Sequence, residues 1–365
     1  MSLRWFVLLV FVAFYAFLIL SKHHRAKGTW VAVGLLALGG WLMREQESAG
    51  LLTPSALFFD AVNWNVIGVL SGAMLIADLF IESRVPVLLS DLIAARCRTV
   101  HMALLGVCAL SGFISAFVDN VTTVLIVGPV ALAIAKRTGF SPVPLLVGIA
   151  ICSNLQGAAT LIGDPPSMIL AGYYKLSFND FFVYESRPSI FFAIQLGAVA
   201  GLFVLYLIFR RHQRPMVPIE IERPTTWVPT GLIVVMVSFL AVSSRFDPDF
   251  KWLAGTGNAC LGVLALAWAA NRDWTAARKI ITRYEFPTIA FLAGIFVLAY
   301  AMDKSGWVAS IAHGISRIVG ENPFVAYTVI VWVSVLISAF IDNIAYVAVM
   351  LPVTQQLGET VGEIG

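Results

Sequence analysis

Three aspartates lie inside long apolar stretches of the 365-residue chain: Asp119, Asp164 and Asp342. No lysine or arginine occurs deep within these stretches, so we expect none of the three carboxylates to be paired with a base. An unpaired carboxylate in apolar surroundings must be protonated, hold a cation or face water. This is the chemistry that a proton- or sodium-coupling group requires. The alternative is a structural role, in which each side chain caps a half-helix.

Two of these acids belong to an internal repeat. The hexapeptide Ser115–Asn120 recurs as Ser338–Asn343, at an offset of 223 residues, and a proline follows nine residues after each copy. Upstream, the segments 64–72 and 286–294 match at an offset of 222. Two matched segments at nearly one offset indicate that the chain contains two related halves.

The apolar segment 143–172 is interrupted at its centre by residues that end helices: Gly157, Gly163, Pro165 and Pro166. Such an interruption frees backbone carbonyls that can bind a cation and a half-helix N-terminus that can bind an anion. Polar side chains gather around it, on Asn154, Gln156, Thr160, Asp164 and Ser167. We therefore predict one crossing made of two half-helices with a polar site at the break. The alternative is that the glycines and prolines only aid helix packing.

Composition defines the elements that must position these residues. Hydrophobic residues make up 59% of the chain and charged residues 12%, against roughly 25% in an ordinary soluble protein. The net charge of +3 without an extended basic region excludes nucleic-acid binding as the main function, and four isolated cysteines indicate neither a zinc site nor a disulfide framework. The sequence therefore predicts an all-α polytopic membrane protein.

The positions of the basic residues predict an orientation. The connecting segments divide into two sets, one with sixteen of the 24 lysines and arginines and one with eight, so we assign the first set to the cytoplasm and the N-terminus to the outside. Segment 100–135 then starts and ends on the cytoplasmic side, which favours a re-entrant hairpin with Asp119 and Asn120 at its tip. The second hairpin, 324–353, opens outward, so the two repeats are inverted. We expect N-terminal scaffold spans at 1–54, a first transport repeat at 55–209, a cytoplasmic linker at 210–226 and a second repeat, truncated in this chain, at 227–365.

The segment Ser115–Pro129, followed by the segment Asn154–Pro166, resembles the ion transporter superfamily. Within it the chain is most similar to citrate-transporter-like permeases, which group with arsenite-pump membrane subunits, D-type sodium/proton antiporters and divalent-anion/sodium symporters. The resemblance covers about residues 55–365. It implies helical hairpins whose tips meet broken helices at a central ion and substrate site, an elevator movement, and a homodimeric scaffold.

The resemblance also implies which residues bind the ion and substrate. They are Ser115, Asp119, Asn120, Thr122 and Thr123 in one tip, Asn154, Gly157, Thr160, Gly163 and Asp164 in the facing break, and Ser338, Asp342 and Asn343 in the second tip. A sodium ion is expected at Asp119, Asn120, Asp342 and Asn343. The second tip departs from the first because Ala345 and Tyr346 replace Thr122 and Thr123. A second broken helix would fall at 377–390, beyond Gly365.

Together these features predict a secondary active transporter of a small ion that works by alternating access and is coupled to H⁺ or Na⁺. We expect no catalytic residues, no cofactor and no nucleic-acid partner, and a location in the prokaryotic inner membrane. Anion transport, arsenite-type efflux and Na⁺/H⁺ exchange stay open. Two alternatives are a truncated chain that is inactive alone or acts within a membrane assembly, and an intramembrane aspartyl protease. The protease pattern fails because Val118 precedes Asp119 and Leu161 replaces a required glycine.

Overall fold

A computed structural model describes residues 2–21, 24–43, 52–139, 141–211, 221–319 and 322–361 of the chain. Within these ranges the protein is almost entirely helical, with one short two-stranded hairpin. In these described residues, six helical segments are long and apolar enough to cross a membrane, and four shorter apolar helices accompany them. The prediction of an all-α polytopic membrane protein is confirmed.

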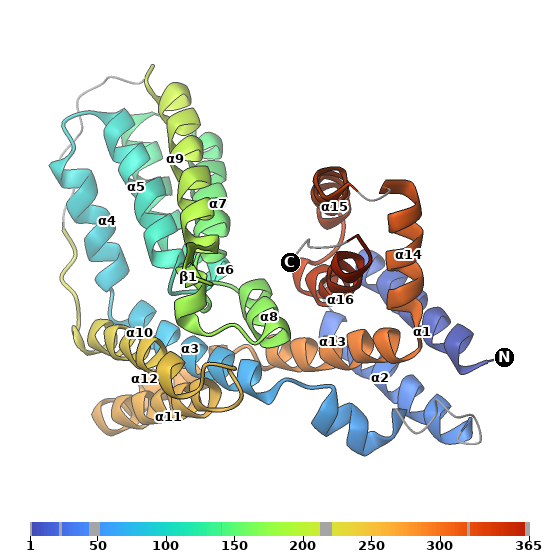
Figure 1. Ribbon diagram of the computed structural model, residues 1–365. Helices are drawn as coiled ribbons and strands as arrows, with labels where there is room; N and C mark the ends of the chain where they lie inside the picture. The colour runs from blue at the N-terminus through green and yellow to red at the C-terminus, as the bar shows by residue number, and fades with distance from the viewer. Residues whose placement is uncertain are drawn as a thin grey trace. The chain divides into compact units, whose positions relative to one another are not determined.

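The chain divides into two compact units (Figure 1). The terminal unit combines Met1–Ile67 with Glu285–Gly365, and the central unit is Gly68–Tyr284. Residues 212–220, most of the expected linker at 210–226, lie outside the described residues, as do 44–51 of the expected N-terminal spans and 362–365 of the second repeat.

The central unit contains most of α3 and all elements up to α12. They are α3 (Trp64–Glu82), α4 (Val85–Arg96), α5 (Val100–Ser115), α6 (Asn120–Thr138), α7 (Pro142–Gly157), α8 (Pro165–Tyr174), η4 (Phe178–Phe181), β1 (Val183–Tyr184), β2 (Arg187–Pro188), α9 (Ile190–Phe209), α10 (Val228–Phe246), α11 (Leu253–Arg272) and α12 (Trp274–Arg283). β1 and β2 pair antiparallel. In Figure 1 the labels α5, α7 and α9 mark helices that lie side by side, and they contact one another.

An apolar core holds the helices of the central unit together. Leu104 and Val107 of α5, Leu145 and Ile149 of α7, and Phe209 of α9 are fully buried in it. Their spacing of three or four residues places each set on one helix face. This packing holds α5 and α7 against each other, and the candidate site begins at their C-terminal ends.

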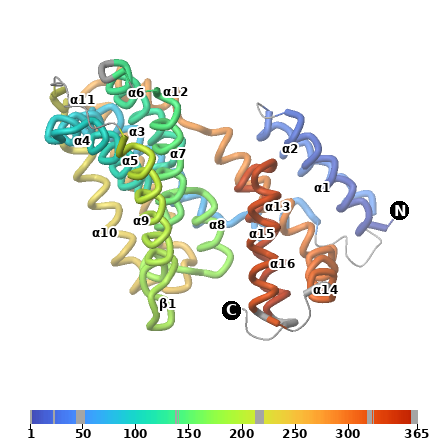
Figure 2. Tube along the Cα trace, turned by 90° about the horizontal axis from the view of Figure 1, so that it is seen from above, coloured from blue at the N-terminus to red at the C-terminus, as the bar shows by residue number. Residues whose placement is uncertain are grey.

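The terminal unit contains α1 (Leu3–Leu20), α2 (Arg25–Leu42), η3 (Ala56–Asp60), α13 (Phe286–Lys304), α14 (Trp307–Val319), α15 (Pro323–Ser338) and α16 (Asn343–Val361). α13 contacts α1, α2, α14 and α16, as Figure 2 shows for the red and blue helices around it. A Cβ at Gly294 of α13 would lie 2.3 Å from the Thr29 methyl carbon of α2, so the absence of a side chain there permits the close approach of these two helices.

Three helices were not predicted: α4, α12 and α14. In α12, Ala277 and Ile280 are buried while the intervening Arg278 and Lys279 are exposed. The helix is therefore amphipathic, and because of its basic residues the hydropathy pattern assigned the segment to a connecting loop. α14 was not predicted for the same reason, since it mixes apolar side chains with His313 and Arg317.

Candidate functional site

The tip of the first hairpin, residues 115–123, joins α5 to α6 through a short turn. Asp119 is the N-cap of α6, and its Oδ2 accepts the Thr122 N–H at 2.9 Å. Asn120 Oδ1 accepts the Val121 N–H at 2.9 Å. The Asp-Asn pair therefore ends the turn and begins the helix, because both side chains bond amides that have no partner within the helix.

The break in segment 143–172 separates α7, which ends at Gly157, from α8, which begins at Pro165. Asp164 is the N-cap of α8, and its Oδ1 accepts the Ser167 N–H at 3.1 Å. Pro165 and Pro166 occupy positions where a helix has no acceptor for an N–H, so they favour a start here. Asp164 is only 7% exposed.

The first tip and the break interlock through polar contacts. Asn120 Nδ2 donates to Asn154 Oδ1 at 2.9 Å. The Ser153 hydroxyl donates to Ser115 Oγ at 3.0 Å and to the Asn120 carbonyl at 3.1 Å. Thr160 donates its hydroxyl to the Ala116 carbonyl. The structure thus brings most of the first-tip and break residues together.

Gly163 lets the two backbones approach closely at this place. A Cβ at this position would lie 2.3 Å from the Gly157 carbonyl oxygen and 2.8 Å from the Ser115 carbonyl oxygen. Both are backbone atoms, which cannot move aside as a flexible side chain can. The carbonyl ends of α5 and α7 and the turn before α8 therefore converge on one point.

Asp119 and Asp164 give this place its electrostatic character. A Cβ at Gly157 would lie 3.5 Å from Asp164 Oδ2, and Asp119 directly precedes Asn120, which bonds Asn154 of the same break. In the part of the chain that the structure describes, neither aspartate forms an ion pair. The potential ligand atoms around them are carboxylate, amide, hydroxyl and carbonyl oxygens, which suit a hard cation such as Na⁺. Each carboxylate also caps a helix, so the structural alternative holds at the same time as any binding role.

Two further residues of the first tip lie on α6. Thr123 is buried, and its hydroxyl points toward the Val118 carbonyl at 3.4 Å. Thr122 supplies the amide that Asp119 caps. Both threonines therefore make these hydrogen bonds to residues of the first hairpin itself.

The second tip, residues 338–343, has a similar turn between α15 and α16. The Ser338 hydroxyl donates to Asn343 Oδ1 at 2.6 Å, and Asp342 Oδ1 accepts the Ile344 N–H at 3.0 Å. Tyr346 directs its hydroxyl to Ser334 within the hairpin, at 2.7 Å. In both copies the aspartate therefore accepts an N–H from the first turn of the following helix, from Thr122 in the first tip and from Ile344 in the second.

The expectation that no base pairs with the three aspartates is wrong for Asp342. Its Oδ2 accepts from Arg25 Nη1 at 3.1 Å. Arg25 is the first residue of α2, at the end of an apolar run, and α2 packs on α13 beside the tip. The sequence places Arg25 near the end of a membrane span, but it does not show that Asp342 of the second tip lies beside that end.

Ser153 was not among the residues predicted for the site, and Gln156 was predicted near the break without a partner. Gln156 and Gln195 exchange two hydrogen bonds, at 2.9 and 3.0 Å, between α7 and α9. The signal available was a polar side chain within an apolar helix, because such a group needs a partner in the membrane. Ser153 directly precedes Asn154, so the same signal was present there.

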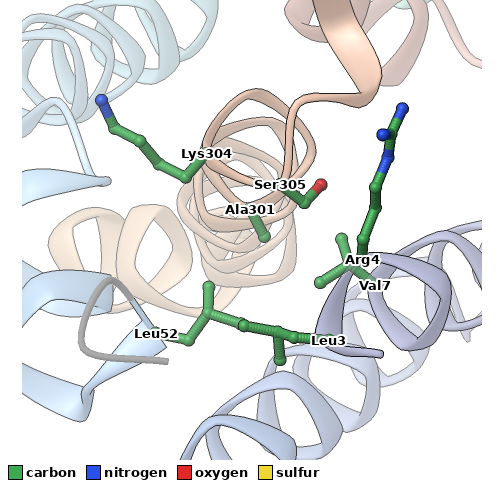
Figure 3. A pocket seen from close by; sticks show the side chains of 7 residues that line it. All are labelled: Leu3, Arg4, Val7, Leu52, Ala301, Lys304 and Ser305. Carbon is green, nitrogen blue, oxygen red and sulfur yellow. The ribbon is translucent and has the colours of Figure 1, made fainter. Parts of the chain in front are cut away.

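A pocket in the terminal unit contains none of the predicted site residues (Figure 3). It is lined by Leu3, Arg4, Val7, Leu52, Ala301, Lys304 and Ser305. Figure 3 shows the Arg4 and Lys304 side chains extending away from the apolar centre of the pocket, on opposite sides. Arg4 bonds Ser310, so this side chain already has a protein partner.

Comparison with known proteins identifies the group to which the chain belongs. The profile of the citrate transporter family matches residues 15–364. An uncharacterized transporter of Mycobacterium tuberculosis is 29% identical over 363 residues, which cover 95% of this chain and 79% of that protein. A 46 kDa membrane protein of Mycobacterium leprae is 28% identical over 312 residues, covering 81% and 69%. Magnetosome protein MamN of Magnetospirillum gryphiswaldense is 26% identical over 371 residues, covering 96% and 79%.

The family match includes both tips and the break, and the resemblance inferred from those motifs is confirmed. A chain with several membrane-spanning helices and this family relationship is a multi-pass integral membrane protein that serves membrane transport. The protein belongs to the citrate transporter family.

Proposed function

We propose that this protein is a secondary active transporter of a small anion and that the first tip and the break bind its coupling cation. One observation carries the proposal. Two helix N-termini, each capped by an aspartate, converge on interlocked backbone carbonyls, and neither aspartate is ion-paired within the described residues. In such a site the carboxylates can bind a cation and the helix N-termini can bind an anion.

A charge count supports a single monovalent cation. Two ionised carboxylates contribute −2, and two helix N-termini contribute roughly +0.5 each, which leaves about −1. One Na⁺ or one proton neutralises that excess. Because uncompensated charge is costly at membrane depth, an empty site would favour binding of the cation.

The class of substrate follows from the same geometry and from the family. Once a cation neutralises the carboxylates, the amide ends of α6 and α8 favour an anion next to it. Citrate is the substrate in the family's description, so a carboxylate anion is the first candidate. Arsenite-type efflux and Na⁺/H⁺ exchange are the other activities to test.

We further propose that the inverted repeats alternate access to this site, as a homodimer in the prokaryotic inner membrane with the N-terminus outside. The repeated hexapeptide and the opposite orientation assigned to its copies from the basic residues support this topology. We assign Asp119 and Asp164 to ion binding, in addition to the first turn of a helix that each one caps.

Initial rates of uptake test the proposal. The full chain is reconstituted in proteoliposomes, and uptake of labelled citrate is measured against Na⁺ at fixed pH and against pH without Na⁺. We expect Asp119→Asn to abolish the dependence on the coupling cation. Asp249→Asn, in an exposed loop, is the matched control and should retain it. Unchanged cation dependence in Asp119→Asn would refute the role of the first tip.

A further inference from the structure

We propose that Arg25 is a built-in counter-ion of the second tip, so that only the first tip takes a mobile coupling cation. This inference rests on the proposed function and deepens it, because it assigns different roles to two copies of one motif. It follows from contacts within the terminal unit, where Arg25 binds the repeated aspartate.

The Arg25 guanidinium is held by three groups. Nη1 donates to Asp342 Oδ2 at 3.1 Å, and Nη2 donates to Thr288 Oγ1 at 3.2 Å. The Thr288 hydroxyl in turn donates to Glu285 Oε2 at 2.6 Å. The guanidinium also lies over the Phe291 ring, 5.3 Å from its centroid. An arginine bound on its edge and its face has little freedom to leave.

The backbone around Arg25 is fixed as well. The Arg25 carbonyl accepts the Thr29 hydroxyl at 2.7 Å, and Thr29 is buried against α13. From α1, the Tyr15 hydroxyl donates to the Ala345 carbonyl at 2.7 Å, just beyond the tip. The N-terminal helices thus hold the second tip at Asp342 and the first turn of α16 at Ala345.

These contacts leave Asp342 with little capacity for an external cation. Its Oδ1 accepts the Ile344 N–H and its Oδ2 accepts from Arg25. Arginine stays protonated at any physiological pH, so its charge cannot be titrated away. The Asp342 carboxylate and the guanidinium cancel, the N-terminus of α16 adds partial positive charge, and the neighbouring Glu285 carboxylate is already bonded by the Thr288 hydroxyl. Asp342 itself therefore lacks the uncompensated negative charge that the first tip offers.

The pair is half-buried, with 36% of the Arg25 side chain and 26% of the Asp342 side chain exposed. A second arginine–carboxylate pair has the same N–O distance, 3.1 Å, but is more exposed: Arg84 and Glu222 at 62% and 50%. Because it lies on neither tip, it provides a matched control for the loss of an ion pair.

The test counts the cations that activate uptake by the full chain in proteoliposomes. Uptake is titrated with Na⁺ at fixed pH and, in a second arm, with protons without Na⁺. We expect a Hill coefficient near one in the wild type. Arg25→Gln exposes the Asp342 carboxylate and should raise the coefficient toward two, or shift the half-activating concentration several-fold. Arg25→Gln/Asp342→Asn should return it to one, and Arg84→Gln should leave it unchanged.

Asp342→Asn keeps the test decisive if Arg25→Gln does not fold. We expect a Hill coefficient near one in both the wild type and Asp342→Asn. A wild type with a coefficient near two that falls to one in Asp342→Asn would show that Asp342 binds a mobile cation and would overturn the inference. A folded Arg25→Gln variant in which both the activation order and the half-activating concentration are unchanged would overturn it too. Asp119→Asn separates the two proposals, because loss of cation dependence there supports the proposed function whatever Arg25 does.

Discussion

Gly163→Ala is the sharpest structural test of the interlocked tip and break. The added Cβ would lie 2.3 Å from the Gly157 carbonyl oxygen, whereas ordinary contacts begin near 3.4 Å, so one backbone must retreat by 1.1 Å. The Ser115 carbonyl oxygen, at 2.8 Å, is also too close. Relief therefore requires that the backbones at Gly157 of the break and at Ser115 of the first tip both move away from residue 163.

Two magnitudes follow from that displacement. Overpacking of this size costs about 1–3 kcal/mol of stability. A shift of about 1 Å at a site that depends on alignment lowers activity by about 100-fold. We expect Gly163→Ala to fold with a lower melting temperature and to lose cation-dependent uptake almost completely.

The assay combines thermal unfolding with citrate uptake in proteoliposomes, so that folding and transport are scored separately. Gly201→Ala is the control, because a Cβ at this position of α9 meets no atom within 4 Å. It should transport like the wild type. Uptake by Gly163→Ala at the wild-type rate and with the wild-type cation dependence would refute the close approach described here.

Three further predictions concern hydrogen bonds of the central unit. Ser153→Ala removes two hydrogen bonds between α7 and the first tip, worth about 1–2 kcal/mol together. The half-activating cation concentration should therefore rise about tenfold in uptake titrations, and an unchanged titration would contradict this. Gln195→Ala leaves Gln156 without its reciprocal partner and should cost about 1–2 kcal/mol in unfolding assays, part of which the double variant Gln156→Ala/Gln195→Ala recovers; equal losses in both would count against the pair. In the loop after α10 the Asp247 carboxylate accepts three backbone N–H groups, so Asp247→Ala should lower the free energy of unfolding by about 2 kcal/mol. Although burial opposes it, these donors hold the pKa of Asp247 below its usual range, so its stabilisation is complete above about pH 4 and is lost as the pH falls further; a variant with the wild-type pH profile of unfolding would refute this.

Local sequence signals located the helix ends at the candidate site. Asp119 and Asp164 both cap helices, and Gly157 and Pro165 border the interruption between α7 and α8. These signals are readable because caps and breaks depend on residues adjacent in sequence. The repeat was readable for a similar reason, since it compares one segment of sequence with another.

Contacts between distant segments were not predictable in this way. Arg25 lies 317 positions from Asp342, and no sequence pattern relates α2 to the second tip. Ser153 was missed because its partners, Ser115 and the Asn120 carbonyl, become neighbours only when α7 packs on the first hairpin. The two copies of the motif look equivalent in sequence, and the helices around them make them different.

The central claim is that the first tip and the break couple substrate movement to a cation. Accumulation of citrate against its gradient measures this coupling most directly, with a Na⁺ gradient and a pH gradient imposed in turn across proteoliposomes containing the full chain. We predict that the wild type accumulates citrate under one of these gradients and that folded Asp119→Asn/Asp164→Asn only equilibrates it. Accumulation by the double variant at the wild-type level would contradict the account.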